Sequence, residues 1–398
     1  MILAFFVSPT ILAQGTLEQQ RQELTTPPPS IEFGPWREVE SDEFTRVFEL
    51  SFPSAYVTPF PENNTVKLRV FLPTENTGPV PSVVVLHYWG ATDLRLEEQT
   101  ARELNAVGVA GVVMILPYHM SRTPKGSKSG ELALQADPPK LVASMTQSIL
   151  DLRRTVDWIQ SRPEFDKVKI GLGGTSLGGI VGALAYGIEP RFTCGSFVLA
   201  GADIAGILWN SSRVVAQREE LRRRGFTEDR LRAALVAIEP GSYLKPDDPR
   251  PSLVIAAKLD TVVPPENARR LISLLGAPST VWLETGHYGG AFVRGRIVQT
   301  VVKFFDTEFR GQKFLPPGSI HAPTLRFGLV YSDEKGLQVA ASTDLWHADA
   351  KGNTFAAAVL TPQGLQGFVG YRTSSGFAFG AMVFPRRTTL GLSFNVAF

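Results

Sequence analysis

Ser176 stands in a sequence setting that suits a nucleophile. It is the central residue of the run G-T-S-L-G (residues 174–178), which follows a short apolar run and precedes an apolar, small-residue helix pattern. A strand, a strained turn carrying one serine and a helix start together form a nucleophile elbow. Side chains at Gly174 and Gly178 would collide with the adjoining strand or helix where the backbone folds sharply. The motif alone also fits an ordinary strand–helix turn, and its flanks favour the elbow.

A serine hydroxyl needs a base to remove its proton and a third group to orient that base. Asp260 ends the apolar run S-L-V-I-A-A-K-L, and His287 lies in a glycine-containing loop after the next strand pattern. Both follow Ser176 in the order serine, acid, histidine that this arrangement uses. Two alternatives concern the acid: Asp260 as a helix N-cap or Asx-turn residue, and Asp203 as the acid in its place. We predict a catalytic triad of Ser176, Asp260 and His287.

Negative charge that develops on a substrate oxygen needs two backbone N–H groups aimed at it in advance. One is expected from Leu177, the residue after the nucleophile. The other is expected from the loop H-Y-W-G (residues 87–90), with the amide of Trp89 as first choice and that of Tyr88 as second. Both aromatic side chains also fit the wall of a substrate pocket, so we predict Tyr88 as a substrate-binding residue.

Strand and helix patterns alternate from residue 44 to residue 312. The runs S-V-V-V-L-H (82–87) and G-V-V-M-I-L-P (111–117) are continuously apolar, as central strands covered on both faces are. Apolar residues at three-and-four spacing from Leu141 to Ile159 predict an amphipathic helix. This alternation predicts an α/β domain over 44–312, with a mostly parallel central sheet and helices on both faces.

Two segments of this domain allow more than one interpretation. Residues 204–245 contain two charged helical patterns, which fit solvated surface helices or, as their position favours, a small helical cap that shapes the substrate cleft. In the loop 118–140, His119 and Arg122 could bind a substrate carboxylate. The simpler interpretation is a positively charged surface loop.

The first residues form an apolar run, M-I-L-A-F-F-V-S-P-T-I-L-A-Q, that resembles the apolar part of a secretory signal peptide. We therefore expect residues 1–14 to be a signal peptide and the protein to be exported to the periplasm, outer membrane or exterior of a bacterium. The alternative is an apolar terminus that is disordered or tucked into the fold. Residues 15–43 are rich in Gln, Glu, Thr and Pro, which predicts a linker.

The composition excludes some classes of protein. The formal charge of +2 over 398 residues gives no reason to expect a nucleic-acid partner. The single cysteine, Cys194, excludes an internal disulfide framework and argues against a cysteine-based metal site. A hydrophobic content of 43% is ordinary for a globular protein with a large core.

Residues 319–398 have a different texture. Six short β-like runs, around Phe327, Val339, Val359, Val369, Phe379 and Phe394, are separated by turn-type stretches. Their spacing predicts consecutive antiparallel hairpins, that is, a C-terminal β-rich module. The last run alternates apolar with small or polar residues and ends on phenylalanine, which resembles the closing strand of bacterial outer-membrane β-barrels. Six strands fall short of the eight in the smallest of these barrels, so a soluble β-module and an outer-membrane-associated one both remain open.

Taken in order, the residues Ser176, Asp260 and His287 and the H-Y-W-G loop resemble the α/β-hydrolase superfamily, especially its dienelactone-hydrolase-like and prolyl-oligopeptidase-like branches. The stretches D-L-R-R-T-V-D-W-I-Q-S-R-P and A-K-L-D-T-V-V-P-P add to this resemblance, which covers residues 44–310. It implies acyl transfer to the serine, with the histidine as base and then acid, and hydrolysis without a metal or organic cofactor. Two departures stand out: Tyr88 where many members carry glycine, and serine where dienelactone hydrolases use cysteine.

These features together predict a serine hydrolase that cleaves a small-molecule carboxylic ester, with peptides and lactones as less favoured substrates. The alternative is an idle hydrolase fold that serves as a binding module at a surface or outer membrane.

Overall fold

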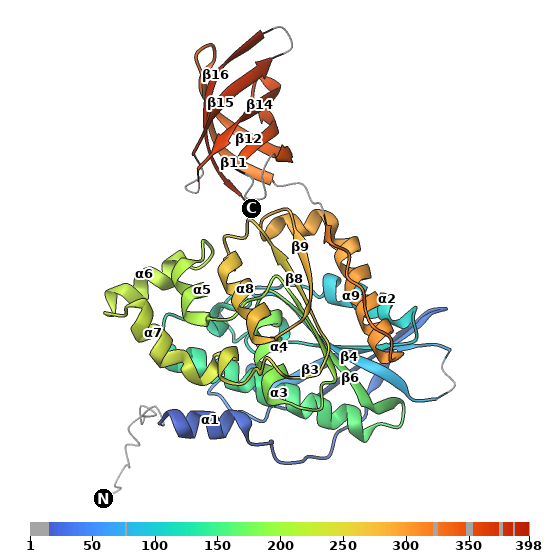
Figure 1. The fold of residues 1–398 in the computed structure, drawn as a ribbon. Coiled ribbons are helices and arrows are strands. Elements are labelled where there is room, and N and C mark those ends of the chain that lie inside the picture. Colours follow the sequence, from blue (N-terminus) through green and yellow to red (C-terminus); the bar gives the residue numbers. More distant parts are fainter. Residues whose placement is uncertain are drawn as a thin grey trace, which may run out of the picture.

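The computed structural model describes residues 16–75, 78–320, 325–347, 353–373, 377–384 and 387–397. These residues form an α/β part built on one ten-stranded sheet and a separate closed barrel of six antiparallel strands at the C-terminal end (Figure 1). The predicted architecture, an α/β domain with a mostly parallel sheet followed by an antiparallel β-rich module, is confirmed. The predicted signal peptide, residues 1–14, lies outside the described residues.

The central sheet has the strand order β1-β2-β3-β5-β4-β6-β7-β8-β9-β10. Neighbouring strands from β5 to β10 pair in parallel, whereas β1, β2 and β3 pair antiparallel at one side. The carboxyl ends of the parallel strands therefore share one edge, where ligands bind in open α/β sheets. The strands are β1 (Arg37–Ser41), β2 (Thr45–Pro53), β3 (Thr65–Pro73), β4 (Val80–Leu86), β5 (Ala110–Met114), β6 (Phe165–Thr175), β7 (Cys194–Val198), β8 (Ser252–Ala257), β9 (Ser279–Leu283) and β10 (Ser319–Ile320).

Helices cover both faces of this sheet and enclose two hydrophobic cores. On one face lie α2 (Arg95–Asn105) and α9 (Arg294–Phe309), which pack against each other. The other face is covered mainly by α3 (Pro138–Ser161), α4 (Leu177–Ile188) and α8 (Pro265–Leu274). Among the described residues, no helix combines the length and the apolar character needed to cross a membrane.

The segment predicted as a linker, residues 15–43, is part of the α/β domain from residue 16 onward. Residues Leu17–Thr25 form helix α1, whose Leu24 is fully buried, and β1 extends the sheet. The Trp36 ring stacks on Phe48 with 4.2 Å between ring centroids and meets Trp158 edge-on. The linker prediction is therefore wrong over 16–43, because these few large apolar residues pack against distant parts of the chain.

Residues 204–245 contain the helices α5 (Ile204–Asn210), α6 (Val215–Arg223) and α7 (Glu228–Leu235). They form a small helical layer in which α7 packs on both α5 and α3 (Figure 1). Leu221, Leu231 and Leu235 turn inward and are buried, while the charged side chains face outward.

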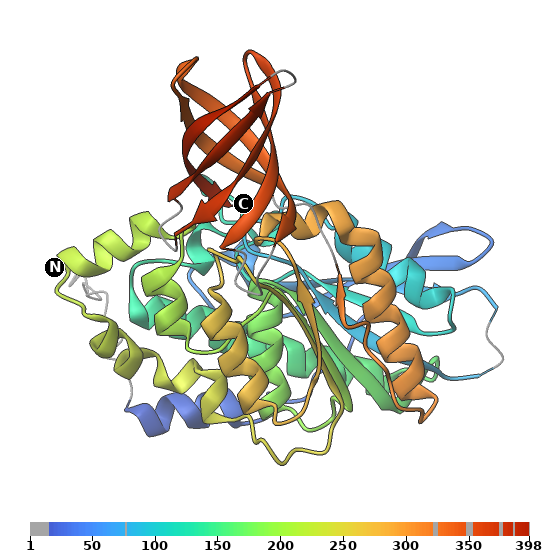
Figure 2. The same cartoon turned by 45° about the horizontal axis from the view of Figure 1, so that its top comes forward.

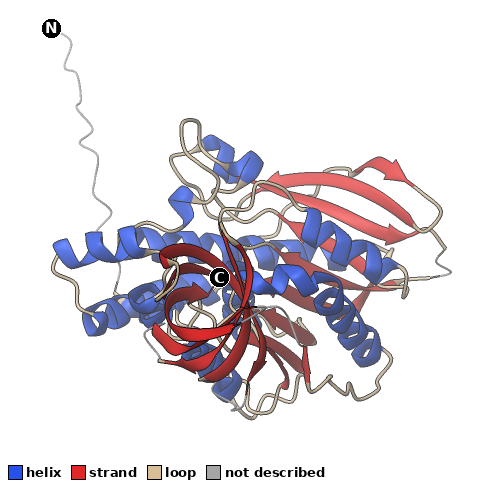
Figure 3. Ribbon diagram, turned by 90° about the horizontal axis from the view of Figure 1, so that it is seen from above, coloured by secondary structure: helices blue, strands red, loops and turns tan. Residues whose placement is uncertain are grey.

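The C-terminal barrel consists of β11 (Leu325–Ser332), β12 (Gly336–His347), β13 (Thr354–Thr361), β14 (Gly364–Arg372), β15 (Phe377–Phe384) and β16 (Arg387–Ala397). Each strand pairs with the next, and β11 also pairs with β16, which closes the ring (Figures 2 and 3). All six predicted β-runs are present. Ser319 and Ile320, predicted as the start of this module, instead pair with β9 as β10.

Candidate active site

Ser176 sits at a sharp turn between β6 and α4. Its backbone has φ 54° and ψ −116°, a conformation that only a few non-glycine residues adopt. The turn is fixed from both sides, since the Ser176 N–H donates to the Val198 carbonyl at 2.8 Å. A Cβ at Gly174 would lie 2.3 Å from the Gly178 carbonyl oxygen, and one at Gly178 would lie 2.5 Å from that of Leu86. Both glycines are therefore needed for the close approach that exposes the serine.

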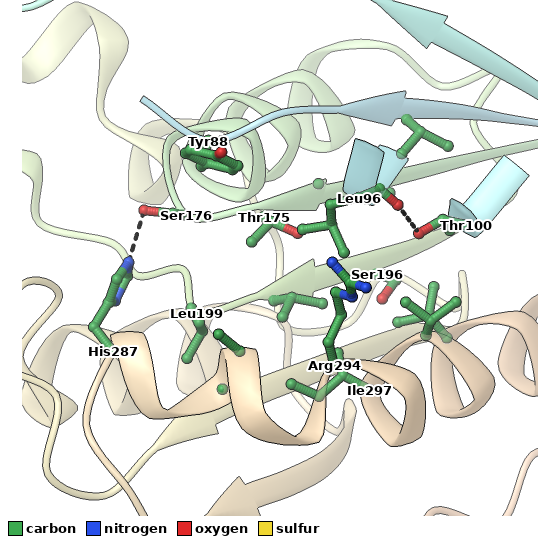
Figure 4. Close-up of a pocket in the computed structure, with 18 of the residues that line it drawn as sticks. Tyr88, Leu96, Thr100, Thr175, Ser176, Ser196, Leu199, His287, Arg294 and Ile297 are labelled. Carbon is green, nitrogen blue, oxygen red and sulfur yellow. Dashed lines mark hydrogen bonds between the residues drawn. The ribbon is translucent and has the colours of Figure 1, made fainter. Parts of the chain in front are cut away.

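The three residues predicted as a triad lie side by side in one hydrogen-bonded chain. The Ser176 Oγ lies 3.1 Å from the His287 Nε2, and the His287 Nδ1 lies 2.7 Å from the Asp260 Oδ2 (Figure 4 shows the first contact). The second Asp260 oxygen accepts N–H groups from Val262 and Val263, each at 2.8 Å. The Asx-turn role considered for Asp260 thus coexists with its contact to the histidine. The Oδ1 atom accepts the two N–H groups of the turn, and the Oδ2 atom contacts the histidine.

The alternative acid, Asp203, has other partners. It caps α5 by accepting the Gly206 N–H at 3.2 Å, and it forms an ion pair with Arg232 at 3.0 Å. No contact between Asp203 and His287 occurs among the described residues. The geometry favours Asp260.

His119 and Arg122 neither line a substrate site nor face the solvent, so both interpretations are wrong for these two side chains, although Lys125 and Lys128 of the same loop are exposed. Both side chains are fully buried. Arg122 pairs with Asp151 at 2.7 Å and donates to the Asn63 and Ile115 carbonyls. These partners lie far away in the sequence or offer only backbone atoms, which is why the loop's composition did not reveal them.

His119 instead supports the loop that carries Tyr88 and Trp89. Its Nε2 accepts the Gly90 N–H at 3.1 Å, and its Nδ1 lies 2.8 Å from the Pro117 carbonyl. An Nε2 that accepts a hydrogen bond belongs to a neutral ring, and burial lowers the pKa of His119 to about 4. His87 is arranged in the same way and, through burial and the neighbouring histidine, has a pKa lowered to about 3.

The backbone N–H groups that could stabilise an oxyanion belong to Leu177 and to the loop 87–90. Leu177 is the first residue of α4, so its N–H is one of those that a helix leaves without an internal partner. The amide of Gly90 is taken up by His119. This leaves the amides of Trp89 and Tyr88 as the donors that the loop offers. Tyr88 lies over Ser176 in Figure 4, and both aromatic residues line the same pocket.

A cavity of about 560 Å³ extends from Ser176 and His287 between the sheet and the helices α2 and α9 (Figure 4). Its walls are mainly apolar and come from β4, β6, β7 and α9, including Val83, Val198 and Ile297. The Arg294 side chain points into it. The helical layer 204–245 contributes Arg213, whose guanidinium lies 5.4 Å from the Trp89 ring centroid.

Sequence reasoning missed Arg294 and the apolar wall of α9, although a signal was present. Arg294, Ile297, Val298, Val301 and Phe305 recur at three-and-four spacing, which places them on one face of the helix. This spacing indicates which face of the helix turns inward. It does not indicate that the face lines a cavity instead of packing fully against the sheet.

Other chemistry-bearing groups give no second centre in the part of the chain that is described. There, no group of three or more His, Cys, Asp and Glu side chains could hold a metal ion. Cys194 is buried in β7, and this burial raises the pKa of its thiol.

Comparison with solved structures identifies the architecture. An acetyl xylan esterase from Paenibacillus sp. R4 superimposes with a TM-score of 0.55 and 16% sequence identity, over 71% of this chain and 92% of that one. Acetyl xylan esterase 1 from Thermoanaerobacterium sp. JW/SL YS485 gives a TM-score of 0.54 at 15% identity, with the same coverage of both chains. The chain has the α/β-hydrolase fold. The α/β domain carries Ser176, Asp260 and His287 at the positions described above.

Two curated relatives come from Mycobacterium tuberculosis, and both are called uncharacterized proteins. One, from strain CDC 1551 / Oshkosh, is 29% identical over 304 residues, which are 73% of this chain and 70% of the relative. The other, from strain ATCC 25618 / H37Rv, is 31% identical over 230 residues, or 56% of this chain and 53% of the relative. The chain thus spans about half the length of the second relative. No family model matches the chain.

Proposed function

We propose that this protein is a serine hydrolase that cleaves carboxylic esters through an acyl-enzyme on Ser176. The single observation that carries the proposal is the hydrogen-bonded chain from Asp260 through His287 to Ser176, which ends at the mouth of an apolar cavity. Serine, histidine and acid in this geometry generate a nucleophile from an otherwise weak hydroxyl. The esterases that share the fold add support of a general kind.

The reaction proceeds in two acyl transfers. The Ser176 Oγ attacks the ester carbonyl carbon as its proton passes to the His287 Nε2, and the carbonyl oxygen becomes an oxyanion facing the Leu177 and loop amides. Collapse of this intermediate breaks the bond to the alcohol oxygen, which takes the proton from His287. Water then attacks the acyl-enzyme by the same route, which releases the acid and restores the serine. Asp260 holds the imidazole in the required tautomer throughout.

The shape of the cavity favours an apolar acyl group longer than acetyl. The cavity leads away from Ser176 along the face of α9, past Leu199 toward Ile297, and its wall is mainly apolar (Figure 4). An extended acyl chain would displace water from this wall and bury apolar surface, which favours binding in proportion to chain length.

Labelling by a fluorophosphonate tests the nucleophile. The wild-type protein is expected to label at Ser176, and Ser176→Ala is expected to lose labelling and at least about 10³-fold in kcat/KM for p-nitrophenyl esters. Ser212→Ala is a matched control, because Ser212 is exposed and its hydroxyl bonds the Thr261 hydroxyl at 2.9 Å rather than a residue of the hydrogen-bonded chain. Full esterase activity in Ser176→Ala would refute the proposal.

A series of p-nitrophenyl esters tests the acyl site. Ile297→Phe narrows the cavity, so kcat/KM for an octanoyl ester should fall by about tenfold or more while that for an acetyl ester changes little. Gln299→Phe adds the same ring on the exposed face of the same helix and should leave both values unchanged. Equal losses for both esters in Ile297→Phe would argue against an acyl chain in this cavity.

The alternative, an idle fold used only for binding, gains no support from the site. It would be favoured if His287 lay beyond hydrogen-bond reach of both partners, whereas the two contacts are 2.7 and 3.1 Å.

A further inference from the structure

The outer wall of the C-terminal barrel is apolar around its whole circumference. On every strand, alternate residues face outward, and none of these outward positions in the described part of the barrel carries a charged side chain. One example from each strand in order is Leu329, Val339, Leu360, Val369, Phe379 and Leu392, which are 40–63% exposed. A wall of this size and uniformity marks a surface that is covered in use.

The interior of the barrel holds the charges instead. Asp344 accepts hydrogen bonds from Arg326 at 3.1 Å and from Arg372 at 2.9 Å, and all three side chains are buried. The Arg372 guanidinium also lies 3.6 Å from the Phe355 ring centroid. Charged side chains are almost never buried unless they are paired, and they normally face water. This distribution is the reverse of that in a water-soluble barrel.

The backbone of the barrel has no open edge. Six strands pair in sequence and β11 closes onto β16, so the ladder hydrogen bonds are made within the ring. Closed barrels are one of only two structures that satisfy their backbone groups inside hydrocarbon. The strands contain 8 to 12 residues, a range that includes the approximately 9–11 residues a tilted strand needs to span a bilayer.

The two tyrosines of the barrel mark its two ends. Tyr331 faces outward beside the turn that contains Asp333 and Lys335, whereas Tyr371 faces outward at the opposite end, where it pairs with Thr354. Amphipathic aromatic residues are enriched at both surfaces of a membrane, with an apolar band between them. The barrel therefore carries an apolar band with one tyrosine at each border.

We propose that this outer wall is embedded in the hydrocarbon layer of a lipid bilayer. A protein partner, including a second copy of this chain, would cover one side of the ring and leave the other strands exposed. Lipid surrounds the ring and covers all six strands at once. Known single-chain membrane barrels begin at eight strands; in this six-stranded ring the ion trio and Phe355 fill the interior.

The topology then fixes the position of the hydrolase domain. The first and last strands run side by side, with Arg326 opposite Ala397, so the chain enters and leaves the barrel at the same end. Only residues 321–324 separate β10 of the hydrolase domain from β11. The α/β domain is therefore held on one side of the membrane, next to the end of the barrel where the chain enters. This inference does not depend on the proposed esterase activity.

Two variants of the full chain, each with one added surface cysteine, test the proposal. Each purified variant is transferred from detergent into phosphatidylcholine vesicles. An environment-sensitive fluorophore at Leu392→Cys should be quenched at least twofold by lipids carrying a quencher in the acyl chain, and the protein should float with the vesicles. The same fluorophore at Gln363→Cys, in an exposed turn, is the matched control and should not be quenched. Cys194 is buried and stays unlabelled in the folded protein.

A second variant tests the apolar wall directly. Leu360→Arg should lower vesicle flotation at least tenfold, whereas Gln363→Arg should not, with circular dichroism as the check on folding. Two results would overturn the proposal: equal quenching at positions 392 and 363, or a detergent-free chain that stays in solution and associates with itself in a concentration-dependent way.

Discussion

Glu97 is a buried carboxyl group that no other described side chain neutralises, and it offers a sharp test of the electrostatics near the site. It lies in α2, beside the cavity-lining Leu96, and is only 1% exposed. Neither carboxylate oxygen accepts a hydrogen bond from another described residue. Burial, followed by the nearby charges of Asp93 and Glu98, raises the pKa of Glu97 to about 7 from its ordinary 4.5. Replacing Glu97 by glutamine keeps the shape and removes the charge.

The sign and size of the effect follow from this difference. Because the folded protein holds the proton more tightly than the unfolded chain, its stability is greatest below pH 4.5 and falls as the pH rises through about 7. Each unit between the unfolded pKa of 4.5 and the folded pKa of about 7 corresponds to about 1.4 kcal/mol. The ionised Glu97 therefore lowers the free energy of unfolding by roughly 3 kcal/mol. Glu97→Gln should therefore change the free energy of unfolding little near pH 4.5 and raise it by roughly 3 kcal/mol at pH 8 and above.

Urea unfolding between pH 5 and pH 9, followed by tryptophan fluorescence, measures this directly, since all tryptophans except Trp346 lie in the α/β domain. Glu103→Gln is the matched control. It removes the same charge from the same helix at a partly exposed site that bonds Gln99, and its effect should stay within about 0.5 kcal/mol at every pH. A gain for Glu97→Gln that is the same at pH 5 and pH 8, or a loss at pH 8, would refute the reasoning.

Three further outcomes follow from the site and its supports. Asp260→Asn should lower kcat/KM on the order of 10³–10⁴-fold by favouring the wrong imidazole tautomer, and a near-wild-type rate in p-nitrophenyl ester assays would remove Asp260 from the triad. Asp151→Asn leaves the buried Arg122 without its counter-ion and should cost about 3–5 kcal/mol in urea unfolding. If that variant lost less than about 1 kcal/mol, the pair would not be a structural support. His119 has a folded pKa below its unfolded value, so the stability it contributes should be lost as the pH falls from 6.5 toward 4, and His119→Gln should flatten the measured slope in that window.

The hydrogen-bonded contact of Ser176, Asp260 and His287 could be predicted because each of the three residues follows a local signal. Ser176 lies in a glycine-framed turn, Asp260 ends an apolar strand, and His287 sits in the loop after the next one. Parallel strands bring their carboxyl ends to one edge of the sheet, so local position along the chain is enough to place all three residues together.

The supports of the site could not be predicted in this way, because their partners are remote. Arg122 is held by Asp151 and by the Asn63 carbonyl, neither of which has a pattern that points to it. Trp36 lies in a stretch whose composition is typical of a linker, and only its stacking on Phe48 and contact with Trp158 place it in the domain. Composition describes a segment's average, whereas one or two large side chains decide whether it is anchored.

In the two sheets of this protein, regular alternation along a strand does not by itself indicate which residues are buried. In β3, Val66, Leu68 and Val70 are buried while Lys67 and Arg69 face out, so alternation and charge agree. In β16, alternation is just as regular, but the large residues face out and the small ones face in. The physical reason is the narrow interior of a six-stranded ring, which has room for glycine and serine next to its few large residues. The alternation alone does not distinguish the two sheets. The sizes of the alternating side chains do, because the open sheet buries its large residues and the closed ring exposes them. In the barrel the large residues are displayed while the charged side chains of Arg326, Asp344 and Arg372 are buried, and this reversal is the observation on which the proposed membrane contact rests.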